Sequence, residues 1–176
     1  MRKRIKLKKN KNTEKTDKML AFVLLKAAGV LAGVIVLFSF IFGIFFCNGE
    51  TMYPRLRDGD IAIYYRLVGT YQVGDVVVYE NTGEPAVARI AARQGDTVEI
   101  NGEGQLIVNG NIQQEEIFFP TEPIAGGIAY PYDVKEGEFF LLCDYRPNSS
   151  DSRFFGGVSK EDIRGKVINL FRRRGI

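Results

Sequence analysis

Few side chains in this 176-residue chain can carry out chemistry, because the sequence has no histidine and only two cysteines. Without histidine, serine-histidine and cysteine-histidine nucleophile pairs and histidine metal sites are excluded. Two cysteines cannot form a thiolate metal cage, so we expect no metal and no cofactor. The segment GETMYPRL (49–56) offers one candidate hydroxyl nucleophile, Thr51. Its methyl group restricts the rotamers and crowds the approach to a carbonyl.

A hydroxyl nucleophile needs a base, and the lysines available after residue 46 are Lys135, Lys160 and Lys166. Arginine is far too basic for this role. The two cysteines, Cys47 and Cys143, either form a disulfide outside the cytosol or remain free thiols, and the sequence leaves both alternatives open.

Charge is distributed unevenly along the chain. Before the first apolar run, the chain has nine basic residues and only two acidic ones, Glu14 and Asp17. The basic residues are Arg2, Lys3, Arg4, Lys6, Lys8, Lys9, Lys11, Lys15 and Lys18. The part from Cys47 onward is mildly acidic. Because a nucleic-acid-binding domain should itself be basic, we expect no nucleic-acid partner.

A long apolar segment follows the basic one. Residues 27–46 carry no charge and are long enough to span a hydrocarbon core of about 30 Å. We predict a basic cytoplasmic segment over 1–19, a transmembrane helix over 20–46 and an extracellular domain over 47–176. A cleaved signal peptide is the alternative, but the apolar stretch is too long and no small-x-small site follows it. The expected location is the cell membrane, with a single pass and the N-terminus in the cytoplasm.

Short runs rich in β-branched and aromatic residues follow, separated by turn residues. We predict strands over 61–67, 75–80, 86–93, 96–100, 105–110 and 137–142, so the expected class is mainly β. Only SKEDI (159–163) has a helical pattern, with Ser159 as N-cap. Residues 120–131 are expected to form a long loop, either a lid or partner surface or an ordinary connection. The tail 169–176, with three arginines, either contacts anionic lipid or is solvated.

Four stretches, in order, resemble the type I signal peptidases: GETMYPRLRDGD, VGDVVVYE, VARIAARQGDTVEI and CDYRPNSSDSRFFGGVSKEDIRGKV. The resemblance covers the apolar segment and nearly all of the outer domain. It implies an antiparallel signal-peptidase-like β domain and a serine-lysine dyad that removes signal peptides from exported chains. In that dyad, a neutral lysine takes the proton of the serine.

Both dyad positions are substituted in this sequence. Thr51 matches the serine and Ala88 matches the lysine. Arg89 adjoins Ala88, but strand alternation points it to the other face. Threonine can act as a nucleophile, whereas alanine cannot act as a base. We therefore expect the dyad to be absent.

The resemblance also assigns supporting positions around the dyad. Gly49 matches the oxyanion-hole region, and Met52 follows the nucleophile position in the first box. Ser149 matches the serine that hydrogen-bonds the dyad lysine, and here we expect it to bond a nearby backbone group instead. Asp151 and Arg153 are expected to form an ion pair that braces the cleft. Asp144 belongs to the same box, in which Cys143 and Tyr145 replace Gly and Asn and add volume.

Three functions remain open. The first is a non-catalytic accessory factor that binds exported or pilin-type proteins in pilus or surface-protein assembly with a sortase. This sequence resembles the signal-peptidase-like pilus-assembly proteins of Gram-positive bacteria in its length, single anchor and double substitution. The second is an active signal peptidase with Thr51 as nucleophile, and the third is an inert membrane protein. The oligomeric state is not indicated.

Overall fold

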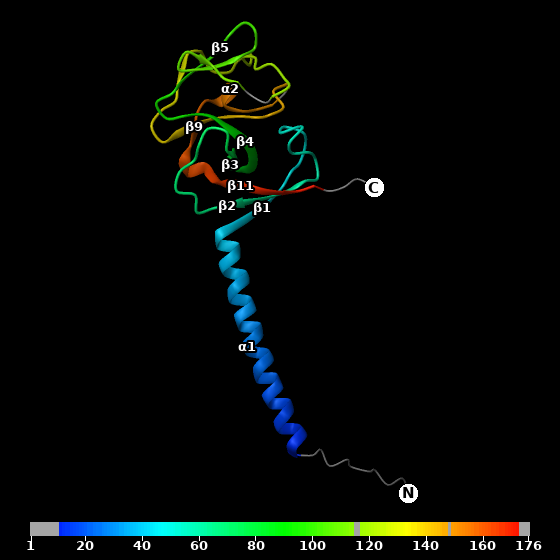
Figure 1. Cartoon of the computed structure of the whole chain (residues 1–176). Coiled ribbons are helices and arrows are strands. Elements are labelled where there is room, and N and C mark those ends of the chain that lie inside the picture. Colours follow the sequence, from blue (N-terminus) through cyan, green and yellow to red (C-terminus); the bar gives the residue numbers. More distant parts are fainter. Residues whose placement is uncertain (1–10, 115–116, 148, 173–176) are drawn as a thin grey trace. The chain divides into compact units, whose positions relative to one another are not determined.

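The computed structural model describes residues 11–114, 117–147 and 149–172, and it divides into a helical unit up to Phe40 and a β-rich unit from Ile41 (Figure 1). The helical unit consists of α1, which runs over Lys11–Ile41. Within α1, Lys15–Ile41 is long and apolar enough to cross a membrane. Its leucine, valine and phenylalanine side chains are mostly exposed.

The prediction of a helix through residue 46 was wrong at its C-terminal end. Phe42–Phe46 forms strand β1, which pairs antiparallel with β2 (Ile61–Tyr65) over five residue pairs. The sequence FGIFF suits either a helix or a strand by composition, because a short apolar run has no periodicity that separates the two. Pairing with IAIYY decides in favour of the strand.

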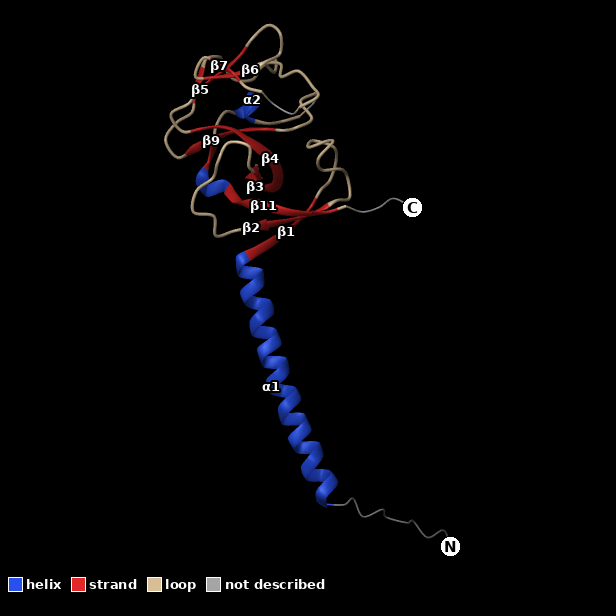
Figure 2. Cartoon of the chain, viewed as in Figure 1, coloured by secondary structure: helices blue, strands red, loops and turns tan. Residues whose placement is uncertain are grey.

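The β unit contains two antiparallel sheets among the described residues (Figure 2). The larger sheet has the order β1-β2-β11-β3-β4-β9-β10, and the smaller has the order β7-β6-β5-β8. The remaining strands of the larger sheet are β3 (Val76–Asn81), β4 (Glu84–Arg93), β9 (Glu138–Leu142), β10 (Val158–Ser159) and β11 (Ile163–Phe171). The smaller sheet comprises β5 (Thr97–Ile100), β6 (Leu106–Val108), β7 (Asn111–Ile112) and β8 (Tyr132–Asp133). The mainly β class is confirmed.

The helical prediction for 159–163 was only partly right. The structure has a single 3-10 turn, η1, over Lys160–Asp162, and the Ser159 side chain caps it by accepting from the Glu161 N–H. A short helix that we did not predict, α2, spans Ser152–Phe155.

The long strand β4 connects two hydrophobic cores. Ala88 and Ile90 belong to one core, with β3, β11 and the turn after β1, whereas Ala91 and Ala92 belong to the other, with the small sheet. An irregularity in the β4–β9 pairing lies between Ile90 and Ala92, where the strand passes from one core to the other. The same strand therefore contributes buried residues to both cores.

The expected loop over 120–131 has no regular structure but is fastened to the β unit. The Ile128 N–H donates to the Arg153 carbonyl at 3.1 Å, and Arg153 Nη1 donates to the Glu122 carbonyl at 3.1 Å. Thr121 is buried. The loop therefore packs on the buried arginine.

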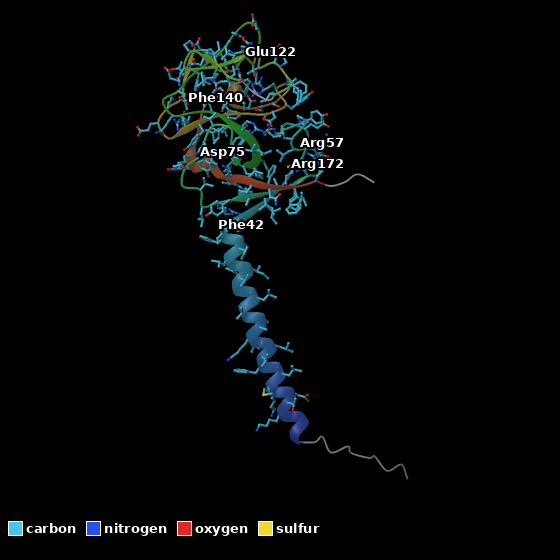
Figure 3. All side chains as sticks on the ribbon, in the orientation of Figure 1. Phe42, Arg57, Asp75, Glu122, Phe140 and Arg172 are labelled. Carbon is cyan, nitrogen blue, oxygen red and sulfur yellow. The ribbon has the colours of Figure 1, made fainter. Side chains whose placement is uncertain are left out.

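The end of the chain forms part of the sheet as far as residue 171, so the tail expected over 169–176 begins later than predicted. Asn169–Phe171 belongs to β11, and residues 173–176 lie outside the described residues. The Arg172 side chain reaches the turn after β1, where its Nη2 donates to the Arg55 carbonyl at 3.1 Å (Figure 3).

Candidate functional site

Thr51 lies in a closed turn between β1 and β2. The neck of the turn is formed by two backbone hydrogen bonds, from the Cys47 N–H to the Asp60 carbonyl at 2.8 Å and from the Gly59 N–H to the Cys47 carbonyl at 2.9 Å. Met52 and Leu56 are buried and fasten the turn to the core, while Thr51 is exposed. The turn therefore holds the backbone of Thr51 in place and leaves its side chain exposed.

Gly49 also lies in this turn, with a positive φ of 83° that favours glycine. Its N–H donates to Asp58 Oδ1 at 2.8 Å. That N–H is thus already engaged within the turn, and an oxyanion-binding role for Gly49 stays a prediction.

Two contacts hold the Thr51 segment against the residues after β9. The Thr51 carbonyl accepts from the Tyr145 N–H at 2.9 Å, and the Met52 sulfur accepts from the Asp144 N–H at 3.3 Å. These contacts bring the first and the last motif boxes of the sequence together.

Ala88 is fully buried in β4, with 0% of its surface exposed. It belongs to the same core cluster as Met52, Cys47 and Cys143. Its methyl group can neither accept nor donate a proton. The residue at the position that the resemblance assigns to the general base therefore cannot act as one.

Arg89 lies on the opposite face of β4, as predicted, and its guanidinium is fully engaged in structural contacts. Its Nε and Nη2 bind the two carboxylate oxygens of Asp144 at 2.8 and 2.5 Å, and its Nη1 donates to the Gly74 carbonyl at 2.8 Å. We did not predict the ion pair between Arg89 and Asp144. It fastens the loop that carries Asp144 to β4.

The lysines outside the helix do not compensate for Ala88. Lys166 Nζ is paired with Asp75 Oδ1 at 2.6 Å. The described residues that line the groove beside Thr51 include no lysine. Their ionisable side chains are Cys47, Tyr64, Glu84 and Arg164.

The groove beside Thr51 has a volume of about 410 Å³ and a mostly apolar lining. Its walls come from β1, from the Thr51 turn and from the start of β4, over Glu84–Val87. In the described sheet β1 is an edge strand, and β4 pairs with β9 only from Arg89 onward. The groove therefore runs between two stretches of strand edge whose backbone groups can pair with an added strand.

The predicted ion pair between Asp151 and Arg153 is confirmed. Arg153 Nε lies 2.9 Å from Asp151 Oδ1, and both side chains are almost completely buried. Asp151 Oδ2 also accepts from the Cys143 N–H at 3.1 Å, and Arg153 Nη2 donates to the Arg146 carbonyl at 2.7 Å. Together these contacts stabilise the whole segment after β9.

Ser149 has the kind of partner that we predicted for it. Its hydroxyl donates to the Tyr145 carbonyl. The serine is therefore occupied by its own loop.

Cys47 and Cys143 are both free and buried. Burial, together with the negative charges of Asp60 and Asp58, raises the pKa of Cys47 to about 11. Burial, with Asp151 adding to it, raises the pKa of Cys143 to about 12, against smaller opposing contributions from Ser149, Arg153 and Arg146. Both thiols are thus protonated near neutral pH and are poor nucleophiles.

The sequence matches one protein family over most of its length. Residues 19–171 match the family described as signal peptidase, peptidase S26. The chain belongs to this signal peptidase family. It is 31% identical to signal peptidase I T of Bacillus subtilis (strain 168), over 88% of each chain. It is 29% identical to signal peptidase I S of the same strain, over 93% of this chain and 94% of the relative.

Among solved structures, a crystal structure of a signal peptidase I from Enterococcus faecalis V583 is similar, with 24% identity and a TM-score of 0.48. The similarity covers 57% of this chain and 99% of that chain. In this signal peptidase homologue, the N-terminal apolar helix is consistent with a membrane anchor.

Proposed function

We propose that this signal peptidase homologue has lost catalysis and binds extended segments of exported proteins. One observation carries the proposal: the base position, Ala88, is a fully buried alanine in the core. A missing general base lowers a rate by roughly 10² to 10⁴, and by more where nucleophile and base act as a unit. The exposed Thr51 hydroxyl alone does not restore that loss.

Binding requires much less than catalysis does. An extended segment needs free strand edges for main-chain hydrogen bonds and pockets for alternate side chains. The groove beside Thr51 has both, with β1 on one wall and residues 84–87 on the other. Its apolar lining favours a segment with apolar side chains.

The proposed setting is pilus or surface-protein assembly at the cell membrane, with pilin-type proteins and a sortase as partners. The double substitution supports a role without proteolysis in this setting, because it removes the base and leaves the groove. The basic residues before α1 support a cytoplasmic N-terminus, a single pass and an extracellular β unit. The competing function is an active signal peptidase, which the exposure of Thr51 in the groove wall favours.

The catalytic question is tested with the full-length protein in detergent and a signal-peptide substrate. We expect no cleavage above that of the Thr51→Ala variant. Cleavage that disappears in Thr51→Ala would establish the active peptidase and overturn our proposal. Glu84→Gln would then test the carboxylate in the groove as the base.

The binding function is tested by blocking the groove. Ala86 is half-buried in the groove wall, so Ala86→Arg places a long charged side chain where an apolar segment would lie. We expect loss of pilus polymers in a deletion strain complemented with Ala86→Arg. Ala125→Arg, at an exposed alanine outside the groove, and Thr51→Ala should both complement fully. Full complementation by Ala86→Arg would contradict binding in this groove.

A further inference from the structure

We propose that Cys143 fills the space that a long side chain at position 88 would need, so that positions 88 and 143 form a coupled packing pair. The inference rests on the packing of β4 and the segment after β9. It does not depend on the partner or on the setting proposed above. Its consequence is that restoring a lysine at position 88 requires a second change at position 143.

The strand register places the two residues side by side. In the β4–β9 pairing, Arg89 lies opposite Leu142 and Ile90 lies opposite Leu141. The pairing ends at Arg89 and Leu142, and one further step in the same register would bring Ala88 opposite Cys143. Directly opposed residues of an antiparallel pair have Cβ atoms about 4.5 to 5.5 Å apart.

The core assignment agrees with this register. Ala88 and Cys143 belong to one hydrophobic cluster, whereas Leu142, the residue before Cys143, belongs to the other. Ala88 is 0% exposed and Cys143 is 3% exposed. An added side chain therefore meets packed atoms, and cores of this density tolerate extra volume poorly.

The backbone of Cys143 has little freedom to move aside. Its N–H donates to Asp151 Oδ2 at 3.1 Å, and its carbonyl accepts from Arg146 Nε at 2.7 Å. Both partners are buried. A shift of Cys143 away from position 88 would break hydrogen bonds of buried charged groups, which are costly to leave unmade.

The hydroxyl of Ser149 already has a hydrogen-bond partner. The Ser149 hydroxyl donates to the Tyr145 carbonyl. An ammonium group at the end of a residue-88 side chain would have to compete for that hydroxyl. Replacing Cys143 by glycine removes the side chain that we infer to be the steric obstacle.

The coupling is measured by thermal unfolding of the full-length protein in detergent. The variants are Ala88→Lys, Cys143→Gly and the double variant, with Cys47→Gly and its Ala88→Lys double variant as the matched control. Cys47 is the other buried free thiol of the same cluster. Ala88→Met, which adds length without charge, takes the place of Ala88→Lys if the lysine variant does not fold.

We expect Ala88→Lys to lower the Tm by about 5 °C or more in the parent background. In the Cys143→Gly background we expect less than roughly half of that loss, because coupled neighbours are not additive. The Cys47→Gly background should leave the loss unchanged. An equal loss of Tm in the parent and Cys143→Gly backgrounds would overturn the proposal.

Discussion

Position 88 carries only a methyl group and is fully buried in the core. Cys143 belongs to the same core cluster, and the Ser149 hydroxyl donates to the Tyr145 carbonyl of its own loop. Thr51 differs from Ala88 in kind, because its hydroxyl remains exposed and able to react in principle. At this scale, the loss of catalysis that we propose depends on residue 88 more than on residue 51.

Two buried thiols make the folded state sensitive to alkaline pH. Both cysteines have a reference pKa of 9.0, and burial raises it to about 11 for Cys47 and about 12 for Cys143. Below pH 9 both thiols are protonated in the folded and unfolded states. Above it, the unfolded chain releases protons that the folded chain retains, so stability falls, by up to about 1.4 kcal/mol per pH unit per thiol.

The measurement is the midpoint of urea unfolding between pH 8 and pH 11. We expect the midpoint to fall as the pH rises above 9, and to fall less steeply in Cys143→Ala than in the parent. Identical slopes would show that Cys143 titrates alike in the folded and unfolded chains.

The ion pair between Asp151 and Arg153 is expected to be the most sensitive charged pair. Both groups are buried, so Asp151→Ala leaves an unpaired guanidinium in the core and should cost about 3 to 5 kcal/mol. The control is Glu80→Ala, which breaks the exposed pair with Arg164 and should cost less than about 1 kcal/mol. Urea unfolding compares the two, and similar costs would show that burial does not determine the strength of the pair.

At the scale of elements, the sequence predicted most of the central strands. All six predicted strands exist, because alternation and turn residues identify them locally. The missed β1 continues the apolar run of α1 without a break, and only its pairing with β2 separates them. The missed β11 has a register irregularity between Val167 and Asn169, which interrupts the alternation that identifies a strand.

In the candidate site, too, the sequence predicted some contacts and not others. The motif boxes predicted the pair Asp151–Arg153 because its residues are two positions apart. The pair Arg89–Asp144 joins residues 55 positions apart and depends on the β4–β9 register, which the sequence did not reveal. The groove depends in turn on β1, so its outer wall could not be predicted while Phe42–Phe46 was taken as helix.

The close packing of β1 on β2 leads to a prediction about one glycine. A Cβ on Gly43 would lie 2.1 Å from the ring of Tyr64, which is buried and lines the groove. Gly43→Ala should therefore displace Tyr64 and destabilise the protein by about 1 to 3 kcal/mol. Gly69→Ala is the matched control, since a Cβ there meets no atom within 4 Å. A Gly43→Ala variant as stable as the control would contradict this packing of β1.

At the scale of the whole molecule, the chain leads directly from the anchor into the groove. β1 begins at Phe42, immediately after α1 ends at Ile41. Residues 44–46 of β1 line the groove, so the strand that forms one wall follows the apolar helix in the chain without an intervening loop.

This arrangement is useful outside the cell only if the β unit is translocated, and the charge pattern predicts that it is. Nine basic residues precede the apolar part of the helix, and such residues remain in the cytoplasm. We expect external protease to remove a tag placed after Ile176 on intact cells, whereas a tag before Met1 should survive until the cells are lysed. Replacing the basic residues of 2–18 with glutamine should lower the fraction of chains cleaved outside, because it removes the charge that sets the orientation. Protection of the C-terminal tag in intact cells would reverse the assigned topology, and with it the access of the groove to exported partners.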